Sequence, residues 1–337
     1  MNAITSSFGL AKQTAKGTPA AETGATWFLA TDQSAGAQPR IRQLPFEMGA
    51  GTLSRGLVKT GVSGMAALSG VPRPESLGHI LMGLLGEVAS ADQTGYYQHT
   101  FKINTTDPVD VPYYTMFREV DNSFGEQVDD VRVAALTMDM AATNFVTGDF
   151  ALAGITPALV TDTSGWTPDA DDSPPFVACS GAVKVETGDT ITTLPVRAAS
   201  LTFANGLAVD ENFVIGSYYP QDIDVLTRVI TVELVVLVKD IALYRKAMYD
   251  PAEGSSWLPD VFETSQVEHL TFKTAENIPG QAVPYSLAVT VEKAHWVAAP
   301  ISLRGTDNVL VRLTGSVVQT DGADPVTVVL TNETTAY

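Results

Sequence analysis

The sequence predicts a mainly β protein with at least one helix, and three observations lead to that prediction. The chain has 337 residues, of which 45% are hydrophobic and 17% charged, an ordinary globular composition whose length suggests about two domains. Most of it consists of short runs rich in Val, Thr, Tyr and Phe, separated by Gly, Pro, Asn and Asp, as strands joined by turns are. One segment shows helical periodicity instead.

Strands are expected wherever such runs occur. In Ser286–Val291 the apolar Leu287, Val289 and Val291 share one face, which is the two-residue period of a half-buried antiparallel strand. The predicted strands are Thr26–Ala30, Tyr96–Ile103, Val131–Met140, Val196–Phe203, Leu226–Val238, Tyr285–Val291, Val309–Val318 and Val326–Leu330.

The helix is expected over Glu75–Val88. Its apolar residues follow helical spacing and form one stripe: Leu77, Ile80, Leu81, Leu84, Leu85 and Val88. Pro74 suits the first helical position, and Gly86 lies where a helix C-cap would fall. A weaker candidate helix covers Asp240–Tyr249, although these residues could instead continue the preceding strand.

An internal repeat suggests that the chain contains a tandem duplication. His99–Lys102 followed by Val111–Tyr113 recurs as His269–Lys273 followed by Val283–Tyr285. A cut after Asp172 leaves 10 basic and 19 acidic residues on each side, so each part carries a charge of −9. The predicted organisation is an N-terminal arm (1–24), a first β domain (25–166), a Pro- and Asp-rich linker (167–175) and a second β domain (176–337).

The charge argues against nucleic-acid binding. Twenty Lys and Arg against 38 Asp and Glu give a net charge of −18, which repels phosphate, although sliding contact without binding stays open. Met1–Thr18 lacks the apolar stretch of a signal peptide. The longest apolar run, Val229–Val238, is about half a membrane span and contains Glu233, so neither export nor a membrane anchor is expected.

The four histidines do not suggest a catalytic site. His79 lies off the apolar helix face and is expected on the helix surface, whereas His99 and His269 occupy matched repeat positions and are expected to have a structural role. His295, beside Trp296, is interpreted as a packing or interface residue. No catalytic, cofactor-binding or metal-binding residue is therefore predicted.

The other motifs and residue types that could form a catalytic or metal site do not predict one either. There is no glycine-rich phosphate loop, H-E-x-x-H motif or cysteine pair, and Cys179 is expected to be a buried small hydrophobic residue. Two acidic clusters are interpreted as solvated loop faces rather than calcium sites, because neither matches the twelve-residue calcium loop. Their members are Glu119, Asp121, Glu126, Asp129 and Asp130 in one, and Asp169, Asp171 and Asp172 in the other.

Four stretches, in this order, resemble one known family. They are Phe8–Ala20, the helix opening Pro74–Gly78 ahead of Leu84–Gly86, the strand His99–Phe101, and Leu194–Arg197 leading to Ser200–Gly206. Together they resemble the tail tube proteins of bacteriophages with long, non-contractile tails. The resemblance implies two packed antiparallel sheets with a flanking helix, a fold similar to the tube protein of type VI secretion.

The resemblance also implies a structural virion protein, not an enzyme, that forms stacked rings around a channel through which DNA passes. The expected partners are further copies of the chain, the tape measure protein and the proteins at the tail ends, with assembly in the host cytoplasm and no cofactor. The alternatives are a tail terminator or capsid decoration protein, and a secreted adhesin or carbohydrate-binding module.

Ring size follows from combining the repeat with the resemblance. Single-domain relatives form six-membered rings, so a duplicated chain predicts a trimeric ring with pseudo-sixfold symmetry. The alternative is a hexamer of chains that each contain one tube domain and an unrelated β domain. Sheets of neighbouring copies are expected to join edge to edge, and polar hairpins to bridge successive rings. The candidate bridging segments are Met1–Gly24 and Gly49–Gly70.

Overall fold

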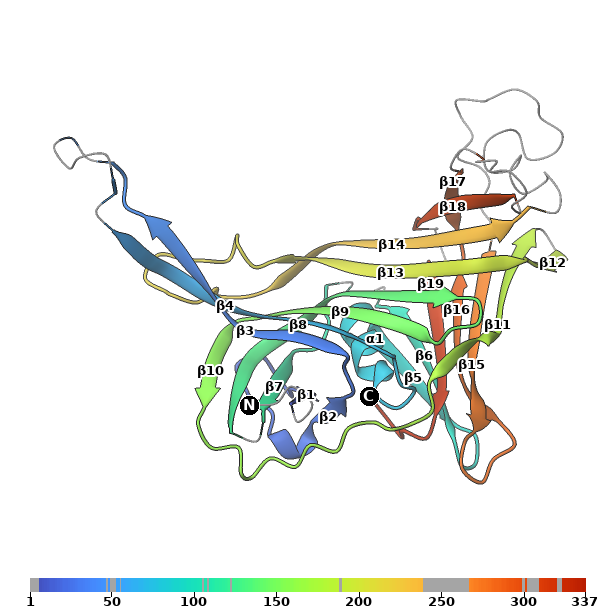
Figure 1. Ribbon diagram of the computed structural model, residues 1–337, viewed down its shortest axis with the longest axis horizontal. Helices are drawn as coiled ribbons and strands as arrows, with labels where there is room; N and C mark the ends of the chain where they lie inside the picture. Colours follow the sequence, from blue (N-terminus) through green and yellow to red (C-terminus); the bar gives the residue numbers. More distant parts are fainter. Residues whose placement is uncertain are drawn as a thin grey trace.

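The computed structural model confirms the predicted fold class, because the residues it describes form two antiparallel sheets and one flanking α-helix (Figure 1). It describes residues 6–46, 48, 53–54, 56–104, 106–107, 109–121, 123–187, 190–238, 267–298, 301, 309–319 and 323–337. The expected helix at Asp240–Tyr249 lies outside these residues.

Within the described residues the larger sheet has 12 strands and the smaller one 7. The larger sheet contains β1 (Ser7–Lys12), β2 (Thr26–Phe28), β3 (Asp32–Gln43), β4 (Leu57–Gly70), β7 (Tyr114–Val120), β8 (Phe124–Ala141), β9 (Val146–Gly154), β10 (Thr156–Val160), β13 (Val196–Ala208), β14 (Asp224–Leu237), β17 (Ala294–Ala298) and β18 (Leu310–Val317). The smaller sheet contains β5 (Gly86–Asp92), β6 (Tyr97–Ile103), β11 (Phe176–Thr187), β12 (Thr190–Thr193), β15 (Val267–Asn277), β16 (Pro284–Val291) and β19 (Val326–Asn332). All eight predicted strands are present, with shifted ends.

Strand β8 organises the larger sheet. Its first half pairs with β7 and β10, and its second half pairs with β9 and β13. An unbroken antiparallel path therefore runs β3-β4-β9-β8-β13-β14-β18-β17, which we call the long sheet. In Figure 1 it forms the upper layer, above α1 (Leu77–Leu85) and the smaller sheet.

Strands from both sides of the predicted linker contribute to both sheets. In the long sheet β8 pairs with β13, and in the smaller sheet β6 pairs with β19. One hydrophobic cluster joins them, with Leu136 and Leu201 of the long sheet and Leu287 of the smaller sheet fully buried in it. The 25–166 and 176–337 division stays a prediction, but the two parts share one core.

The helix begins two residues later and ends three residues earlier than the expected Glu75–Val88, and Gly86 forms its C-cap as the sequence suggests. Ser76 precedes the first turn, and the helix ends at Leu85. Gly86 adopts a φ of 91°, and its N–H bonds to the Met82 carbonyl, which closes the last turn. Val88, which we expected on the helix, instead lies in β5, because a left-handed residue redirects the chain at once.

No helix in the described part of the chain is long and apolar enough to cross a membrane.

Candidate assembly surfaces

The residues singled out in the sequence do not converge on one site. Among the described residues there is no group of three or more His, Cys, Asp and Glu side chains arranged to hold a metal ion.

His79 is half-buried rather than on the helix surface, because the C-terminal Tyr337 covers it. The two ring centroids lie 5.0 Å apart, and His79 Nε2 lies 2.9 Å from Thr26 Oγ1. Burial, with a smaller contribution from the Lys12 charge, lowers the pKa of His79 to about 4. The imidazole is therefore neutral at pH 7.

The repeated histidines lie in the same sheet but in different surroundings. His99 in β6 is fully buried, with Nδ1 2.7 Å from Ser90 Oγ and Nε2 2.8 Å from the Thr334 carbonyl oxygen. Burial lowers its pKa. His269 in β15 is half-buried, with Nδ1 3.2 Å from Thr290 Oγ1. His295 is half-buried in β17, next to the buried Trp296.

Cys179 is exposed, so the expectation of a buried residue was wrong. The pairing of β11 with β15 is interrupted between Val177 and Ala182, and the intervening residues leave the ladder. There is no room for a side chain at Gly181 within this bulge, because a Cβ there would lie 2.7 Å from the Phe272 ring. The bulge therefore turns Cys179 towards solvent, which alternation along a regular strand does not predict.

The first acidic cluster is not a solvated loop face. Glu119 and Asp130 are buried in β7 and β8, and Asp130 accepts a 2.7 Å hydrogen bond from the Gly17 N–H. Glu126 pairs with Arg118 at 3.0 Å. Burial raises the pKa of Asp129. The Asp130 contact joins β8 to the segment that follows β1, and the Glu126 contact joins β8 to β7.

The acidic linker also packs on its own chain. Asp171 accepts hydrogen bonds from the backbone N–H groups of Ser76 and Ser173, at 2.7 and 2.9 Å. Its carboxylate therefore lies at the N-terminal end of α1, where the helix dipole favours a negative charge.

Most of the predicted N-terminal arm is part of the folded body. Ser7–Lys12 forms β1, which pairs with β2 and β7 and buries Phe8 and Leu10. Beyond it, Lys16 pairs with Asp222 at 2.6 Å. Residues 1–5 of the arm lie outside the described residues.

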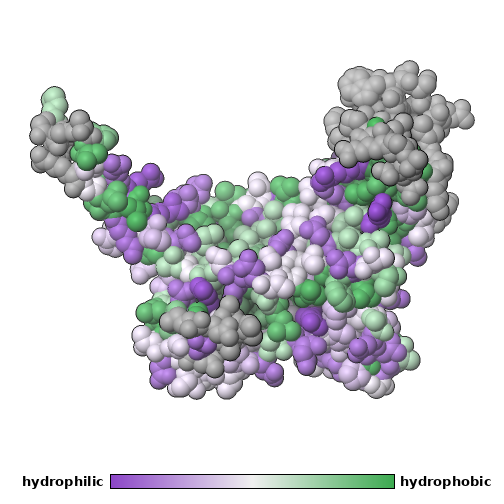
Figure 2. All heavy atoms as spheres, viewed as in Figure 1, coloured by the Kyte–Doolittle hydropathy of each residue, from purple (hydrophilic) through white to green (hydrophobic). Residues whose placement is uncertain are grey.

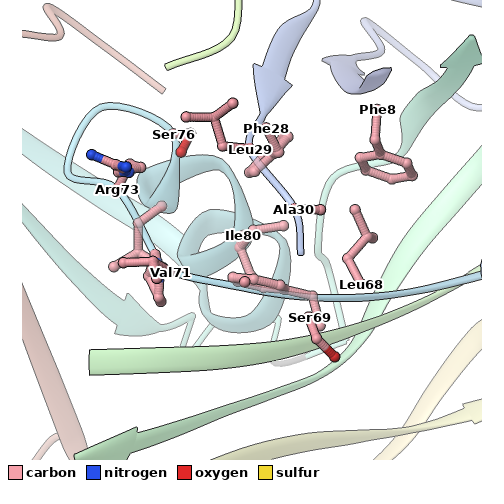
Figure 3. A pocket seen from close by; sticks show the side chains of 14 residues that line it. Phe8, Phe28, Leu29, Ala30, Leu68, Ser69, Val71, Arg73, Ser76 and Ile80 are labelled. Atoms are coloured by element: carbon pink, nitrogen blue, oxygen red, sulfur yellow. The ribbon is translucent and has the colours of Figure 1, made fainter. Parts of the chain in front are cut away.

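The crevice beside α1 is too small for an organic ligand. Phe8, Phe28, Leu68 and Ile80 converge on it from β1, β2, β4 and the helix (Figure 3). Its volume of about 10 Å³ is at the lower limit for one water molecule. This apolar crevice is therefore an ordinary packing defect of the core.

The hairpin of β3 and β4 projects from the body and is apolar near its tip, not polar as expected (Figures 1 and 2). The backbone N–H of Leu44 bonds to the Gly56 carbonyl at 3.0 Å, which closes the ladder just beyond the strands. Its exposed apolar residues are Ile41, Leu44, Phe46, Met48, Leu53, Leu57 and Val58. Such an exposed apolar group marks an interaction surface.

The connection between β13 and β14 supports the base of this hairpin. Val62 donates its N–H to the Tyr218 carbonyl at 2.8 Å, and the Arg40 guanidinium lies 4.6 Å from the Phe213 ring centre. Arg40 also pairs with Asp210. The hairpin is therefore held in its projecting position by a second segment rather than left as an isolated ribbon.

A continuous polar row crosses the long sheet on the face away from the core. Its members lie opposite one another in the ladders of eight successive strands: Asp32, Ser69, Asp149, Thr137, Thr202, Thr231, Ser316 and His295. A neighbouring row consists of Thr147, Asp139, Ser200, Glu233 and Thr314. These two rows make the face rich in hydroxyl groups and carboxylates. Arg312, an exposed base on the same face, pairs with Glu233.

The long sheet also has two edges without a partner in the described part of the chain. At one edge β3 pairs only with β4, and at the other β17 pairs only with β18. Edges of this kind can pair with a strand of another chain.

A family model described as phage tail tube protein matches residues 4–276. No curated protein matches the chain.

Proposed function

The chain belongs to the phage tail tube protein family and is a structural component of the virion tail, and from this premise we propose that it forms rings that stack into a hollow tube for DNA. The proposed partners are other copies of the chain, the tape measure protein and the proteins at the tail ends. Assembly takes place in the host cytoplasm.

The pairing of β8 with β13 is the observation that carries the proposal for the ring. It joins two runs of four strands, β3-β4-β9-β8 and β13-β14-β18-β17, in which every neighbouring pair is antiparallel. Alternation along the path makes β17 run in the same direction as β8, and β3 in the same direction as β13. The β17 edge of one copy can therefore pair with the β3 edge of the next in the same sense.

Repetition of that pairing closes a barrel without free edges. Three copies supply six four-stranded runs, and this supports the trimeric ring with pseudo-sixfold symmetry. A hexameric ring of chains is the alternative, in which the runs are not equivalent.

The polar row supports passage of DNA through this barrel. If the long sheet faces the channel, its rows of hydroxyl and carboxylate groups line the wall. Carboxylates repel phosphate over about 10 Å at 0.1 M salt, so DNA is not retained. Arg312, an exposed base on this face, forms an ion pair with Glu233.

Electron microscopy of the purified chain, with end-on averaging and mass per ring, tests the proposal. Hollow tubes with three chains per ring are the expected result. Six chains per ring would keep the tube and overturn the duplication. Single rings that never stack would favour a terminator or decoration protein, and monomers at high concentration would contradict assembly altogether.

A further inference from the structure

We propose that the chain joins two of its own side chains by an ester bond, formed between the Thr115 hydroxyl and the Gln13 carboxamide with loss of ammonia. Thr115 lies in β7, and Gln13 follows β1, the strand that pairs with β7. The bond ties together two segments that are 102 residues apart in sequence. Because it concerns contacts within one chain, this modification does not depend on the proposed tube.

The two reacting groups are buried and in contact. Thr115 is fully buried, and Gln13 is 5% exposed. The Gln13 oxygen accepts hydrogen bonds from the Thr115 hydroxyl at 3.0 Å and from the Asp130 N–H at 3.1 Å. The NH2 group of Gln13 donates to Asp130 Oδ1 at 2.9 Å. The carboxamide is therefore fixed in one orientation beside the hydroxyl oxygen, which is the positioning that an intramolecular reaction needs.

The groups around Thr115 suit it to act as a nucleophile. The Ala20 N–H donates to Thr115 Oγ1 at 2.9 Å, which leaves a second lone pair of this oxygen for attack. Asp129 of β8 forms a side-chain hydrogen bond with Thr115, and burial raises the pKa of the Asp129 carboxyl. A carboxylate with a raised pKa is a stronger base for the hydroxyl proton.

Asp130 supplies the group that stabilises the developing charge. Its N–H already bonds to the Gln13 oxygen, on which negative charge develops when the carbonyl carbon is attacked. Its backbone has a φ of 53°, a left-handed conformation that residues other than glycine adopt uncommonly. In this conformation both the N–H and the carboxylate of Asp130 contact Gln13, and the carboxylate also accepts a 2.7 Å hydrogen bond from Gly17. Backbone strain of this kind concentrates at functional sites.

The reaction is balanced without any further reactant. Thr115 Oγ1 attacks Gln13 Cδ, and its proton passes to the Asp129 carboxylate. When the tetrahedral intermediate collapses, the Cδ–Nε2 bond breaks and the nitrogen takes up that proton. The products are one ester bond and one ammonia molecule, and no atom is oxidised or reduced. Burial of Thr115 then keeps water from the ester.

Intact-mass spectrometry of the denatured wild-type chain tests the proposal directly. The mass should be lower than that of the sequence by one ammonia molecule, in unassembled chains as well as in tubes. After trypsin digestion, the peptides Gln13–Lys16 and Ile103–Arg118 should be recovered as one linked species. Hydroxylamine, which cleaves esters, should separate them.

Variants assign the roles of the two β-strand residues. Thr115→Val keeps the shape of the side chain but removes the nucleophile, so the sequence mass should return. Thr115→Ser retains a hydroxyl and should still lose ammonia. Asp129→Asn removes the base and should slow the reaction about a hundredfold. As a matched control, Thr331→Val removes a similarly buried hydroxyl from β19 and should leave the mass loss unchanged.

Three results would overturn the proposal, and none of them would affect the tube function. The first is a wild-type chain of unaltered mass whose two peptides are separate. The second is a mass loss without a linked peptide, because a succinimide at Asn205 and Gly206 also releases ammonia but joins no two peptides. The third is a linked species that persists in Thr115→Val, which would exclude Thr115 as the nucleophile.

Discussion

Thr137 and Thr202 face each other across β8 and β13, with their hydroxyl oxygens 3.2 Å apart. They lie 65 residues apart in sequence and belong to the two parts of the chain that the sequence analysis separates. Their contact lies on the outward face of the long sheet, within the polar row. The junction between the two parts is therefore continuous with the surface that we assign to the channel.

Reversing charge on that surface should make the channel retain DNA. Asp139→Lys/Asp149→Lys introduces two exposed bases into adjacent rows. Double-stranded DNA should bind to these tubes at low salt and dissociate as salt rises, as phosphate contacts do. Wild-type tubes should bind none at the same salt. Filter binding measures both, with Asp92→Lys/Asp107→Lys as a charge-matched control away from the row. Equal binding by both variants would refute the channel assignment.

Removing apolar side chains from the hairpin should weaken stacking without unfolding the chain. Phe46→Ser and Leu53→Ser alter side chains that are 68% and 80% exposed, so the free energy of unfolding should change by about 0.5 kcal/mol or less. Sedimentation should show the distribution moving from tubes to rings or free chains. Leu159→Ser, at 65% exposure on β10, is the matched control and should still form tubes. Tubes of normal length from the hairpin variants would exclude a role in stacking.

Acid should destabilise the fold through His79. Its folded-state pKa of about 4 lies below the ordinary 6.5, so between these values the unfolded chain binds a proton that the folded chain does not. Stability therefore falls as the pH drops through this window, by roughly 2 kcal/mol after allowance for solvent screening. Urea unfolding at pH 7.5 and 4.5 measures the loss, which should be smaller in His79→Gln. An unchanged pH dependence in that variant would assign the loss to other groups.

Adding a Cβ at Gly86 should destabilise the chain strongly. Gly86 has a φ of 91°, and a Cβ there would lie 2.6 Å from the Asp110 carbonyl oxygen. Left-handed strain and this clash together should cost Gly86→Ala about 3 kcal/mol. Gly280→Ala, with a φ of 73° and no atom within 4 Å, isolates the strain alone and should cost about 1 kcal/mol. If urea unfolding gave equal losses of unfolding free energy for the two variants, the Asp110 carbonyl would have moved away from the new Cβ at no cost.

Local patterns predicted most of the secondary structure because they depend on residues close in sequence. The alternation in Ser286–Val291 and the stripe from Leu77 to Leu85 each report one buried face. Val88 was misassigned because it continues the helical spacing beyond Gly86, where the backbone conformation ends the helix. Cys179 was misassigned because a bulge, which depends on the partner strand, changes the direction of its side chain.

The assembly surfaces were harder to predict from the sequence than the secondary structure was. Gly49–Gly70 includes β4, but composition did not reveal that the hairpin is apolar at its tip, since side chains such as Phe46 and Leu57 are usually buried. The polar row was not visible either. Its members are single Thr, Ser, Asp and His residues spread from Asp32 to Ser316, and only strand register places them side by side.

By itself the sequence determined that the chain is mainly β, that the stripe from Leu77 to Leu85 forms a helix with Gly86 at its C-cap, and that the net charge is −18. Tertiary structure alone decided that β8 pairs with β13, that Asp130 is buried while Cys179 is exposed, and that Thr137 meets Thr202. The physical reason is the range of the interactions. Periodicity and capping act within a few residues, whereas strand pairing joins segments far apart in the chain and is selected by the packing of the whole core.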